Sequence, residues 1–229
     1  MDADYTLKNA RKRLANLKQT IEGGEYFEID TATFDPHPRK PGWLRHDVPN
    51  PLKYISPEVG AIAAELRAVL DQTIHAAIVA RGPLLPKQRP QFPICQCPKN
   101  FRARIRQDLK GLSIPQVAFI GKLQPYRGHH WLAELKGLAD AHKHRANIFL
   151  RAPEGVLIHG RSLHTEASAE HFHVLPASGV HVPKSVQVNA RFKGKVTLED
   201  GRPVIEVLDI LQAQISSLLD LLKARFGLT

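Results

Sequence analysis

The sequence has only two cysteines, Cys95 and Cys97, and a single residue separates them. Two thiols this close in the chain cannot form a bridge of ordinary geometry, so no disulfide framework is expected. No apolar run reaches the roughly 18 residues that a membrane-spanning helix requires, and the first residues lack the apolar stretch of a secretory signal. We therefore expect a cytoplasmic protein without membrane contact, in the compartment where thiols remain reduced.

Common catalytic and cofactor signatures are also missing from the sequence. It contains no phosphate-binding P-loop, no dinucleotide-binding glycine pattern and no Gly-x-Ser-x-Gly nucleophile elbow. The 12 histidines are candidate metal ligands, but neither a Cys-x-x-Cys nor a His-Glu-x-x-His spacing is present. We predict no metal site and no cofactor.

Acidic residues are outnumbered, with 22 Asp and Glu against 32 Lys and Arg, which gives a formal net charge of +10. This excess favours a polyanionic partner, and we predict RNA or DNA. General solubility explains the same charge equally well, because no run of five or more cations occurs. The candidate phosphate-binding side chains are Arg102, Arg104, Arg106, Lys143 and Arg145.

Hydrophobic periodicity predicts an α+β fold. Apolar residues at helical spacing indicate a helical core over about residues 5–22, 57–145 and 204–226. Residues 25–34 read as a strand, and the proline-rich stretch 35–51 reads as an irregular loop. Short strand-like segments separated by turn residues predict a small antiparallel β-meander over about 146–199, inserted before the C-terminal helix. We expect a single domain over residues 1–229.

A polar stripe interrupts the apolar helix expected over 57–81. Arg67, Asp71 and His75 are four residues apart each time, so they share one helix face. Asp140 and His144 repeat that spacing in a second helix. Charges within a core-like helix are costly unless they pair, so these side chains form either a catalytic site or a structural network.

Four short segments resemble a widespread group of uncharacterised bacterial proteins. That group carries Leu-Arg-x-x-Leu-Asp-His, Phe-Pro-Ile, Leu-Gln-Pro-Tyr and Asp-Lys-His-Arg motifs, and the resemblance covers about residues 55–150. The matching segments here are Leu66-Arg67-Ala68-Val69-Leu70-Asp71, Phe92-Pro93-Ile94, Leu123-Gln124-Pro125-Tyr126 and Lys143-His144-Arg145. No known activity comes with this resemblance.

The Arg-x-x-x-x-His spacing of that group is similar to the catalytic motif of HEPN helical-bundle ribonucleases. Those enzymes cleave RNA without a metal, usually as homodimers, so the resemblance implies a homodimer and a phosphate-binding role for Arg67. Gln72 occupies the place of the histidine here, and Asp140 stands where asparagine is usual.

Two hypotheses follow. The leading one is a nucleic-acid-associated protein, a divergent HEPN-like metal-independent endoribonuclease, in which Asp71 orients His75 or His144 as the proton-transfer group. The alternative is a non-catalytic structural or interaction protein whose Arg67, Asp71 and His144 form a buried scaffold.

Overall fold

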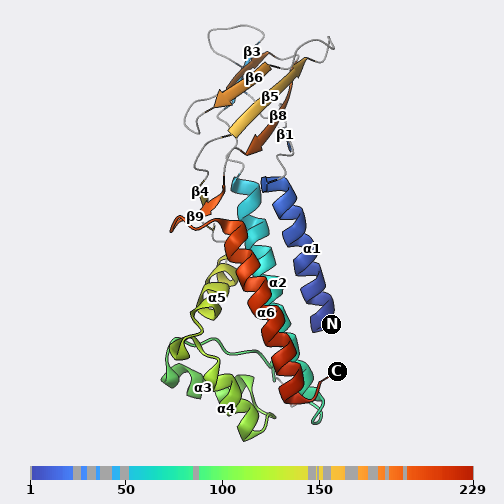
Figure 1. Cartoon of the computed structure of the whole chain (residues 1–229), viewed down its shortest axis with the longest axis vertical. Helices are drawn as coiled ribbons and strands as arrows, with labels where there is room; N and C mark the ends of the chain where they lie inside the picture. Colours follow the sequence, from blue (N-terminus) through green and yellow to red (C-terminus); the bar gives the residue numbers. More distant parts are fainter. Residues whose placement is uncertain are drawn as a thin grey trace. The chain divides into compact units, whose positions relative to one another are not determined.

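Figure 1 shows the computed structural model of the chain. The residues that the structure describes are 2–22, 27–29, 35–36, 43–46, 52–84, 88–143, 148, 150–151, 156–162, 170–174, 180–183, 186–192 and 195–228. The chain divides into two compact units, each made of several stretches. The first comprises Met1–Leu14, Pro57–Ile148 and Glu206–Thr229, and the second comprises Ala15–Ser56 and Phe149–Ile205. The single domain expected from the sequence stays a prediction.

Most of the described chain is helical, as the sequence predicted. A short 3₁₀ turn, η2 (Pro125–Arg127), comes shortly before the fifth of the six α-helices in the described residues. The α-helices are α1 (Ala3–Glu22), α2 (Leu52–Val79), α3 (Pro98–Asp108), α4 (Ile114–Lys122), α5 (His130–Lys143) and α6 (Val204–Phe226).

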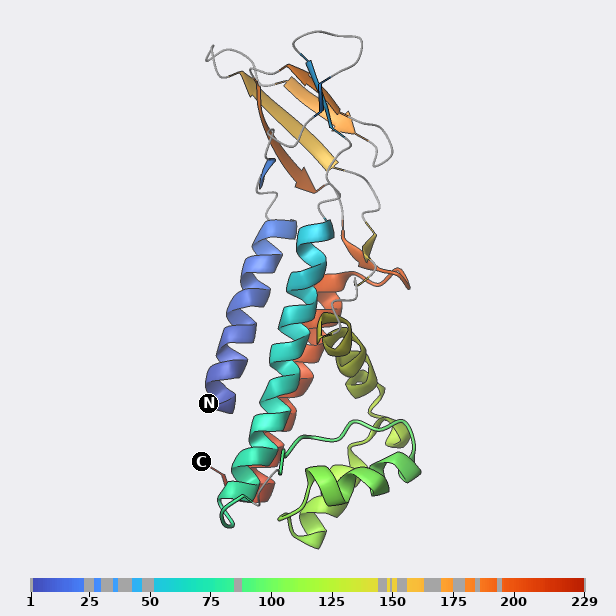
Figure 2. The ribbon, with the colours of Figure 1, turned by 180° about the vertical axis from the view of Figure 1, so that it is seen from behind.

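Helices α1, α2 and α6 lie side by side in the first unit (Figures 1 and 2). The Arg13 guanidinium on α1 lies 2.8 Å from Glu58 and 2.9 Å from Glu65 on α2. Nearer its start, α1 contacts α6 through the pair Asp4 and Lys223. The pair Asp4 and Lys223 joins the beginning of α1 to the end of α6, so these two helices run antiparallel.

The core of this unit is a set of fully buried aliphatic side chains. Burying one leucine or isoleucine stabilises the fold by about 1.5–3 kcal/mol relative to leaving it exposed. Among the described residues with almost no exposed surface are Leu66, Leu70 and Ile74 of α2, Leu132 and Leu135 of α5, and Leu208, Leu211 and Ile215 of α6. Their three- and four-residue spacing is the periodicity that predicted these helices.

Helix α2 begins earlier than the sequence indicated. Ser56 followed by Pro57 predicts a helix start at residue 57, but the helix begins at Leu52 and carries Pro57 inside it. Inside a helix, proline removes one backbone hydrogen bond and its ring crowds the carbonyl four residues earlier, so continuing through Pro57 is costly and needs compensation. Ile55 and Ser56 are both buried, so packing favours continuing the helix through the proline.

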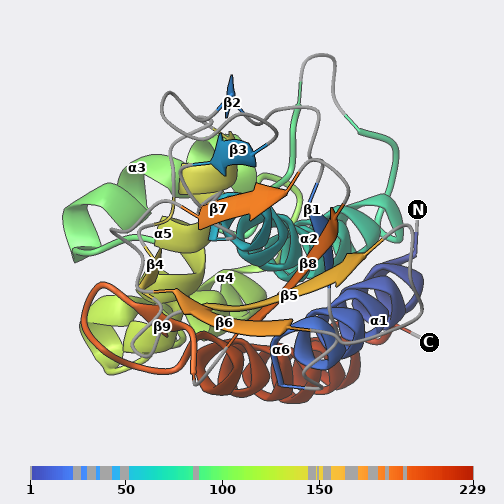
Figure 3. The same ribbon diagram turned by 90° about the horizontal axis from the view of Figure 1, so that it is seen from above.

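The strands of the second unit do not form a meander, so that prediction is wrong. The order in the four-stranded antiparallel sheet is β1 (Phe27–Ile29), β8 (Val186–Phe192), β5 (Val156–Ser162) and β6 (Glu170–Val174) (Figure 3). In a meander each strand would pair with the next one along the chain. Here β8 pairs with β5 on one side. On its other side β8 pairs with β1, which comes from more than a hundred residues earlier in the chain.

The proline-rich stretch 35–51 also contributes strands, which corrects its interpretation as an irregular loop. Strand β7 (Val180–Pro183) pairs with β3 (Trp43–His46), which in turn pairs with β2 (Asp35–Pro36). Pro36 therefore lies in an edge strand, where a residue without a backbone N–H is tolerated. A separate pair joins β4 (Leu150–Arg151) to β9 (Thr197–Leu198).

Helix α5 approaches α2 closely at Gly60. A Cβ atom added to Gly60 would lie 2.7 Å from the Cβ atom of His142, which is closer than two carbons can pack. Gly137 of α5 differs from Gly60, because a Cβ atom added to Gly137 would have no neighbour within 4 Å. The packing of α5 on α2 therefore requires glycine at position 60 and leaves position 137 open to substitution.

These two glycines give a matched pair of variants. We expect Gly60→Ala to lower the free energy of unfolding by about 1–3 kcal/mol, because the methyl group forces α5 away from α2. We expect Gly137→Ala to raise it by about 0.5–1 kcal/mol, because alanine is the better helix former. Urea denaturation followed by circular dichroism measures both, and equal stabilities of the two variants would contradict the close approach.

Candidate functional site

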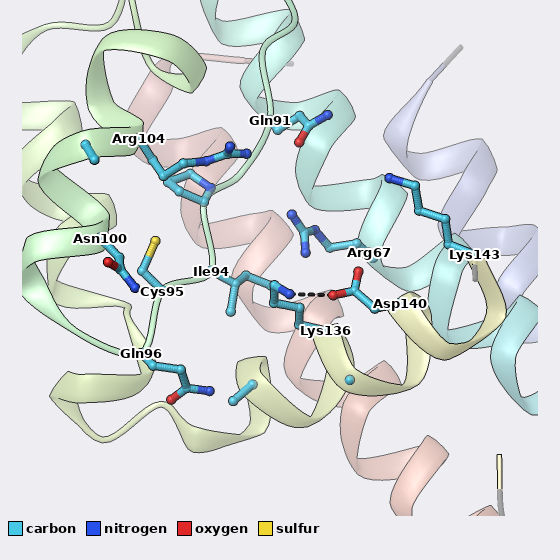
Figure 4. A pocket seen from close by; sticks show the side chains of 14 residues that line it. Arg67, Gln91, Ile94, Cys95, Gln96, Asn100, Arg104, Lys136, Asp140 and Lys143 are labelled. Carbon is cyan, nitrogen blue, oxygen red and sulfur yellow. Dashed lines mark hydrogen bonds and ion pairs between the residues drawn. The ribbon is translucent and has the colours of Figure 1, made fainter. Parts of the chain in front are cut away.

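A cleft of about 810 Å³ opens in the first unit between α2, α3, α5 and the extended stretch 91–96. Among the described residues, four cations line it, Arg67, Arg104, Lys136 and Lys143, against a single carboxylate, Asp140. Figure 4 looks into the cleft, with Arg104 on one side, Lys143 on the other and Arg67 between them. The side-chain amides of Gln91, Gln96 and Asn100 complete its polar lining.

One wall of the cleft is a stretch of chain without secondary structure, fixed by two side chains of α2. Arg67 Nη2 donates a hydrogen bond of 2.9 Å to the Phe92 carbonyl oxygen. The Phe92 N–H donates one of 2.8 Å to Asp71 Oδ1, and Arg67 Nε lies 3.4 Å from the same carboxylate oxygen. Both backbone polar groups of the fully buried Phe92 are thus satisfied by one Arg–Asp pair.

Gln124, which follows α4, holds the same stretch through its side-chain amide. Its Oε1 accepts the Cys95 N–H at 2.9 Å, and its Nε2 donates to the Pro93 carbonyl at 2.9 Å and the Ile120 carbonyl at 3.1 Å. Gln124 is completely buried, so these bonds are made away from water. We call residues 92–95 the clamped segment, because Arg67, Asp71 and Gln124 hold its backbone as neighbouring strands would in a sheet.

Three of the four cleft cations are held by carboxylates four residues along the same helix. Arg67 pairs with Asp71 on α2, Arg104 Nε lies 2.6 Å from Asp108 Oδ2 on α3, and Lys136 pairs with Asp140 on α5. Helical spacing brings such partners together, and each pairing restricts the rotamers of the cation. Lys143 is exposed and has no ion pair with any residue that the structure describes.

Burial shifts the titration of three groups near the cleft. Desolvation raises the pKa of Asp71 above its ordinary value, and Arg67 opposes that shift. Desolvation likewise raises the pKa of Asp108, against the effect of Arg104. Burial also raises the pKa of the Cys95 thiol, so this cysteine stays protonated and is a poor nucleophile near neutral pH.

The structure brings together only part of the predicted catalytic set. Arg67 and Asp140 line the cleft, and Asp71 lies behind Arg67, bonded to the clamped segment rather than to a histidine. His75 is exposed on α2 and is not among the residues that line the cleft. Gln72, in the place of the HEPN histidine, accepts a hydrogen bond of 2.9 Å from the Thr6 hydroxyl.

The predicted nucleic-acid-binding residues divide between two surfaces. Arg104 and Lys143 line the cleft, whereas Arg102 and Arg106 line a separate groove between α3 and α4. His144 and Arg145 lie outside the described residues. Arg67, Asp71 and His75 do lie on α2 at the expected spacing, but His75 does not reach the cleft. The pairing of Asp140 with His144 on a second helix stays a prediction, because His144 is not among the described residues.

Two residues of the site were missed in the sequence. The position of Lys136, four residues before Asp140, predicts an ion pair in the same way as the spacing of Arg67 and Asp71. Gln124 appeared only as part of the Leu-Gln-Pro-Tyr motif, and its role depends on contacts with residues about thirty positions earlier.

The described part of the chain shows neither a metal site nor a membrane-spanning helix. No group of three or more His, Cys, Asp or Glu side chains there is placed to hold a metal ion. None of the described helices combines the length and the apolar character needed to cross a membrane. No family model matches the chain, and comparison with curated proteins and with solved structures gave no match. The resemblances to the bacterial group and to HEPN ribonucleases stay predictions.

Removing the Gln124 side chain tests the clamp. We expect Gln124→Ala to lower the free energy of unfolding by about 3 kcal/mol, because the buried Cys95 N–H and Pro93 carbonyl lose their hydrogen-bond partners. The matched control is Gln96→Ala, because Gln96 is exposed and its loss should cost less than about 0.5 kcal/mol. Chemical denaturation of both variants gives the comparison, and a Gln124→Ala protein as stable as the control would rule the clamp out.

The pKa values of the aspartates are expected to shift in different directions, up for the buried Asp71 and Asp108 and down for the exposed Asp200. By carbon-detected NMR, Asp71 and Asp108 should titrate above the ordinary value of 3.8 and the exposed Asp200, held by Arg202, below it. Because folded Asp71 binds its proton more tightly than the unfolded chain, its contribution to stability is fully present below pH 3.8 and is lost as pH rises through the folded pKa. As pH rises from 3.8 through the folded pKa of Asp71, the free energy of unfolding of the wild type should therefore fall relative to that of Asp71→Asn. A difference between the two proteins that stays constant with pH would contradict the raised pKa.

Proposed function

We propose that this protein binds a phosphate-bearing polyanion, RNA or DNA, in the cleft of its first unit. The observation that carries the proposal is the convergence of four cations from three helices on one cleft, where the described residues supply a single lining carboxylate. Cations held in fixed rotamers make strong charge-assisted bonds to phosphate oxygens. The net charge of +10 acts in the same direction by attracting a polyanion from a distance.

The four cations have different roles in this proposal. Arg67 directs one nitrogen to the Phe92 carbonyl, so part of its bonding capacity is used to hold the cleft wall. Lys143 is exposed and without an ion-pair partner among the described residues, so it gains most from a phosphate. The amides of Gln96 and Asn100 are suited to sugar or base contacts, which phosphates alone do not provide.

Cleavage requires more than the described cleft offers. A metal-independent ribonuclease needs a side chain that transfers a proton near neutral pH, most often histidine. The cleft lining contains no histidine among the residues that the structure describes, and the carboxylate of Asp71 is engaged by the Phe92 N–H. The proposal is therefore binding, with Arg67 and Asp71 in the scaffold role. The proposal combines the nucleic-acid hypothesis with the structural one. Arg67 and Asp71 hold the clamped segment that forms the cleft wall, and the other cleft cations bind the ligand.

The compartment belongs to the same proposal. Cys95 and Cys97 are both free thiols, as expected in the reducing cytosol. RNA or DNA is accessible in that compartment, so a cytoplasmic location agrees with the proposed ligand. The homodimer that the HEPN resemblance implies remains a prediction.

Binding of a labelled RNA tests the proposal. A fluorescein-labelled single-stranded RNA of about 12 nucleotides would be titrated in EDTA by fluorescence anisotropy at several salt concentrations. We expect Lys143→Ala to weaken binding about three- to tenfold and to reduce the salt slope by about one, since one phosphate contact is lost. The control is Lys12→Ala, because Lys12 is exposed on α1 and does not line the cleft.

The outcomes separate the candidate functions. Equal affinities of Lys143→Ala and Lys12→Ala, or affinity independent of salt, would contradict binding in the cleft. The same samples are run on a gel to detect cleavage. RNA that is cut in EDTA by wild type and left intact by His144→Ala would identify the ribonuclease instead.

A further inference from the structure

A second concave surface lies on the opposite side of α3 from the cleft residue Arg104. Helices α3 and α4 lie side by side (Figures 1 and 2), and a groove of about 720 Å³ runs between them. Its floor includes Phe101, which is only 6% exposed, and Leu109, which is 1% exposed. At its edge Ile114 is 86% exposed, the most exposed large apolar side chain in the described chain.

The groove carries two parallel stripes. Phe101, Ile105 and Leu109 follow one another at four-residue intervals and form the apolar stripe. Arg102, Arg106 and Lys110 have the same spacing, one residue further on, and form the cationic stripe. On α3, which ends at Asp108, Phe101 and Ile105 share one face and Arg102 and Arg106 share the neighbouring one. Leu109 and Lys110 follow directly after the helix and line the same groove.

The cationic stripe differs from the cations of the cleft in its electrostatics. Each of the cleft cations Arg67, Arg104 and Lys136 has a carboxylate four residues away on its own helix. Arg102 and Arg106 form no ion pair with any residue that the structure describes, and both are exposed. No carboxylate lines the groove among the described residues. Its positive charge is therefore available to an external partner.

From this pairing of an apolar floor with an uncompensated cationic edge, we infer that the groove binds an acidic amphipathic helix of a partner protein. Such a helix places leucine-like side chains at i, i+4 and i+7 on the floor and carboxylates beside Arg102, Arg106 and Lys110. The distance from Phe101 to Leu109 is about 12 Å along the helix axis, which accommodates two to three turns of the partner. This inference is independent of nucleic-acid binding in the cleft.

Nucleic acid fits this groove less well than the cleft. Single-stranded nucleic acid binds by stacking bases on accessible aromatic faces, and the aromatic residue that lines the groove, Phe101, is almost completely buried. The remaining floor is aliphatic, and phosphates gain nothing from aliphatic surface. An acidic amphipathic helix matches both surfaces, because its apolar side chains pack on the apolar stripe while its carboxylates pair with the cationic stripe.

A designed peptide provides the probe. It is a labelled helix of about 14 residues, with leucine at i, i+4, i+7 and i+11 and glutamate elsewhere on the flanks. A scrambled peptide of the same composition and a peptide with lysine in place of glutamate serve as probe controls. Anisotropy titrations with the full-length protein measure the three affinities.

Variants on each surface distinguish the groove from the cleft. We expect Arg106→Glu to weaken binding of the acidic peptide at least about tenfold, as a reversed contact charge does, and to improve binding of the lysine peptide. Ile114→Ser should weaken the acidic peptide severalfold without a change of charge, and since Ile114 is exposed the fold should persist. Lys143→Ala, at the cleft, should leave peptide binding unchanged, while Arg106→Glu should leave RNA binding unchanged.

Several results would overturn the inference. The acidic peptide could bind no better than its scrambled form, or equally well to wild type and Arg106→Glu. Loss of RNA binding in Arg106→Glu, without loss of peptide binding, would show a nucleic-acid surface. Binding of wild type, but not Arg106→Glu, to vesicles of anionic phospholipid in the absence of peptide binding would show a lipid-directed surface.

Discussion

The candidate site depends on how one irregular stretch of chain obtains its hydrogen bonds. Residues 92–95 have neither helix nor strand partners, and Pro93 prevents regular pairing at its own nitrogen. Buried backbone groups must be bonded, so α2 supplies Arg67 and Asp71 and the turn after α4 supplies Gln124. Without these three side chains, the cleft would lack the wall that faces α5 and its cations.

The cations of the first unit fall into two groups, those paired with a carboxylate on their own helix and those without such a partner among the described residues. Arg67, Arg104 and Lys136 are each held by an aspartate four residues away, which orients them toward a shared cleft. Both side chains are well exposed only in the pair Lys136 and Asp140, where an ion pair contributes little to stability. In all three pairs the carboxylate limits the motion of the cation. On another side of α3, Arg102 and Arg106 have no such partner among the described residues. One short helix thus presents an ordered basic cleft on one side and a basic, apolar groove on the other.

The sequence predicted the features that arise within single helices. Periodic leucine and isoleucine located the buried faces of α2 and α6, and four-residue spacing placed Arg67 and Asp71 on one face. Features that join distant stretches were not predictable: β1 pairs with β8, and Gln124 bonds to Cys95. His75 shows the limit of spacing alone, because two further turns carry it about 12 Å along α2 from Arg67. A single α-helical stripe therefore does not amount to a single site.

The most direct test of this account is hydrogen exchange at two backbone amides. The Phe92 N–H is bonded to Asp71 and the Cys95 N–H to Gln124, although neither residue lies in a helix or a strand. The account predicts that both amides exchange as slowly as the core amides of α2, and that Gln124→Ala accelerates exchange at Cys95 more than at the centre of α2. Exchange at Phe92 and Cys95 as fast as at the exposed Gln96 in the wild-type protein would contradict the clamp and the cleft built on it.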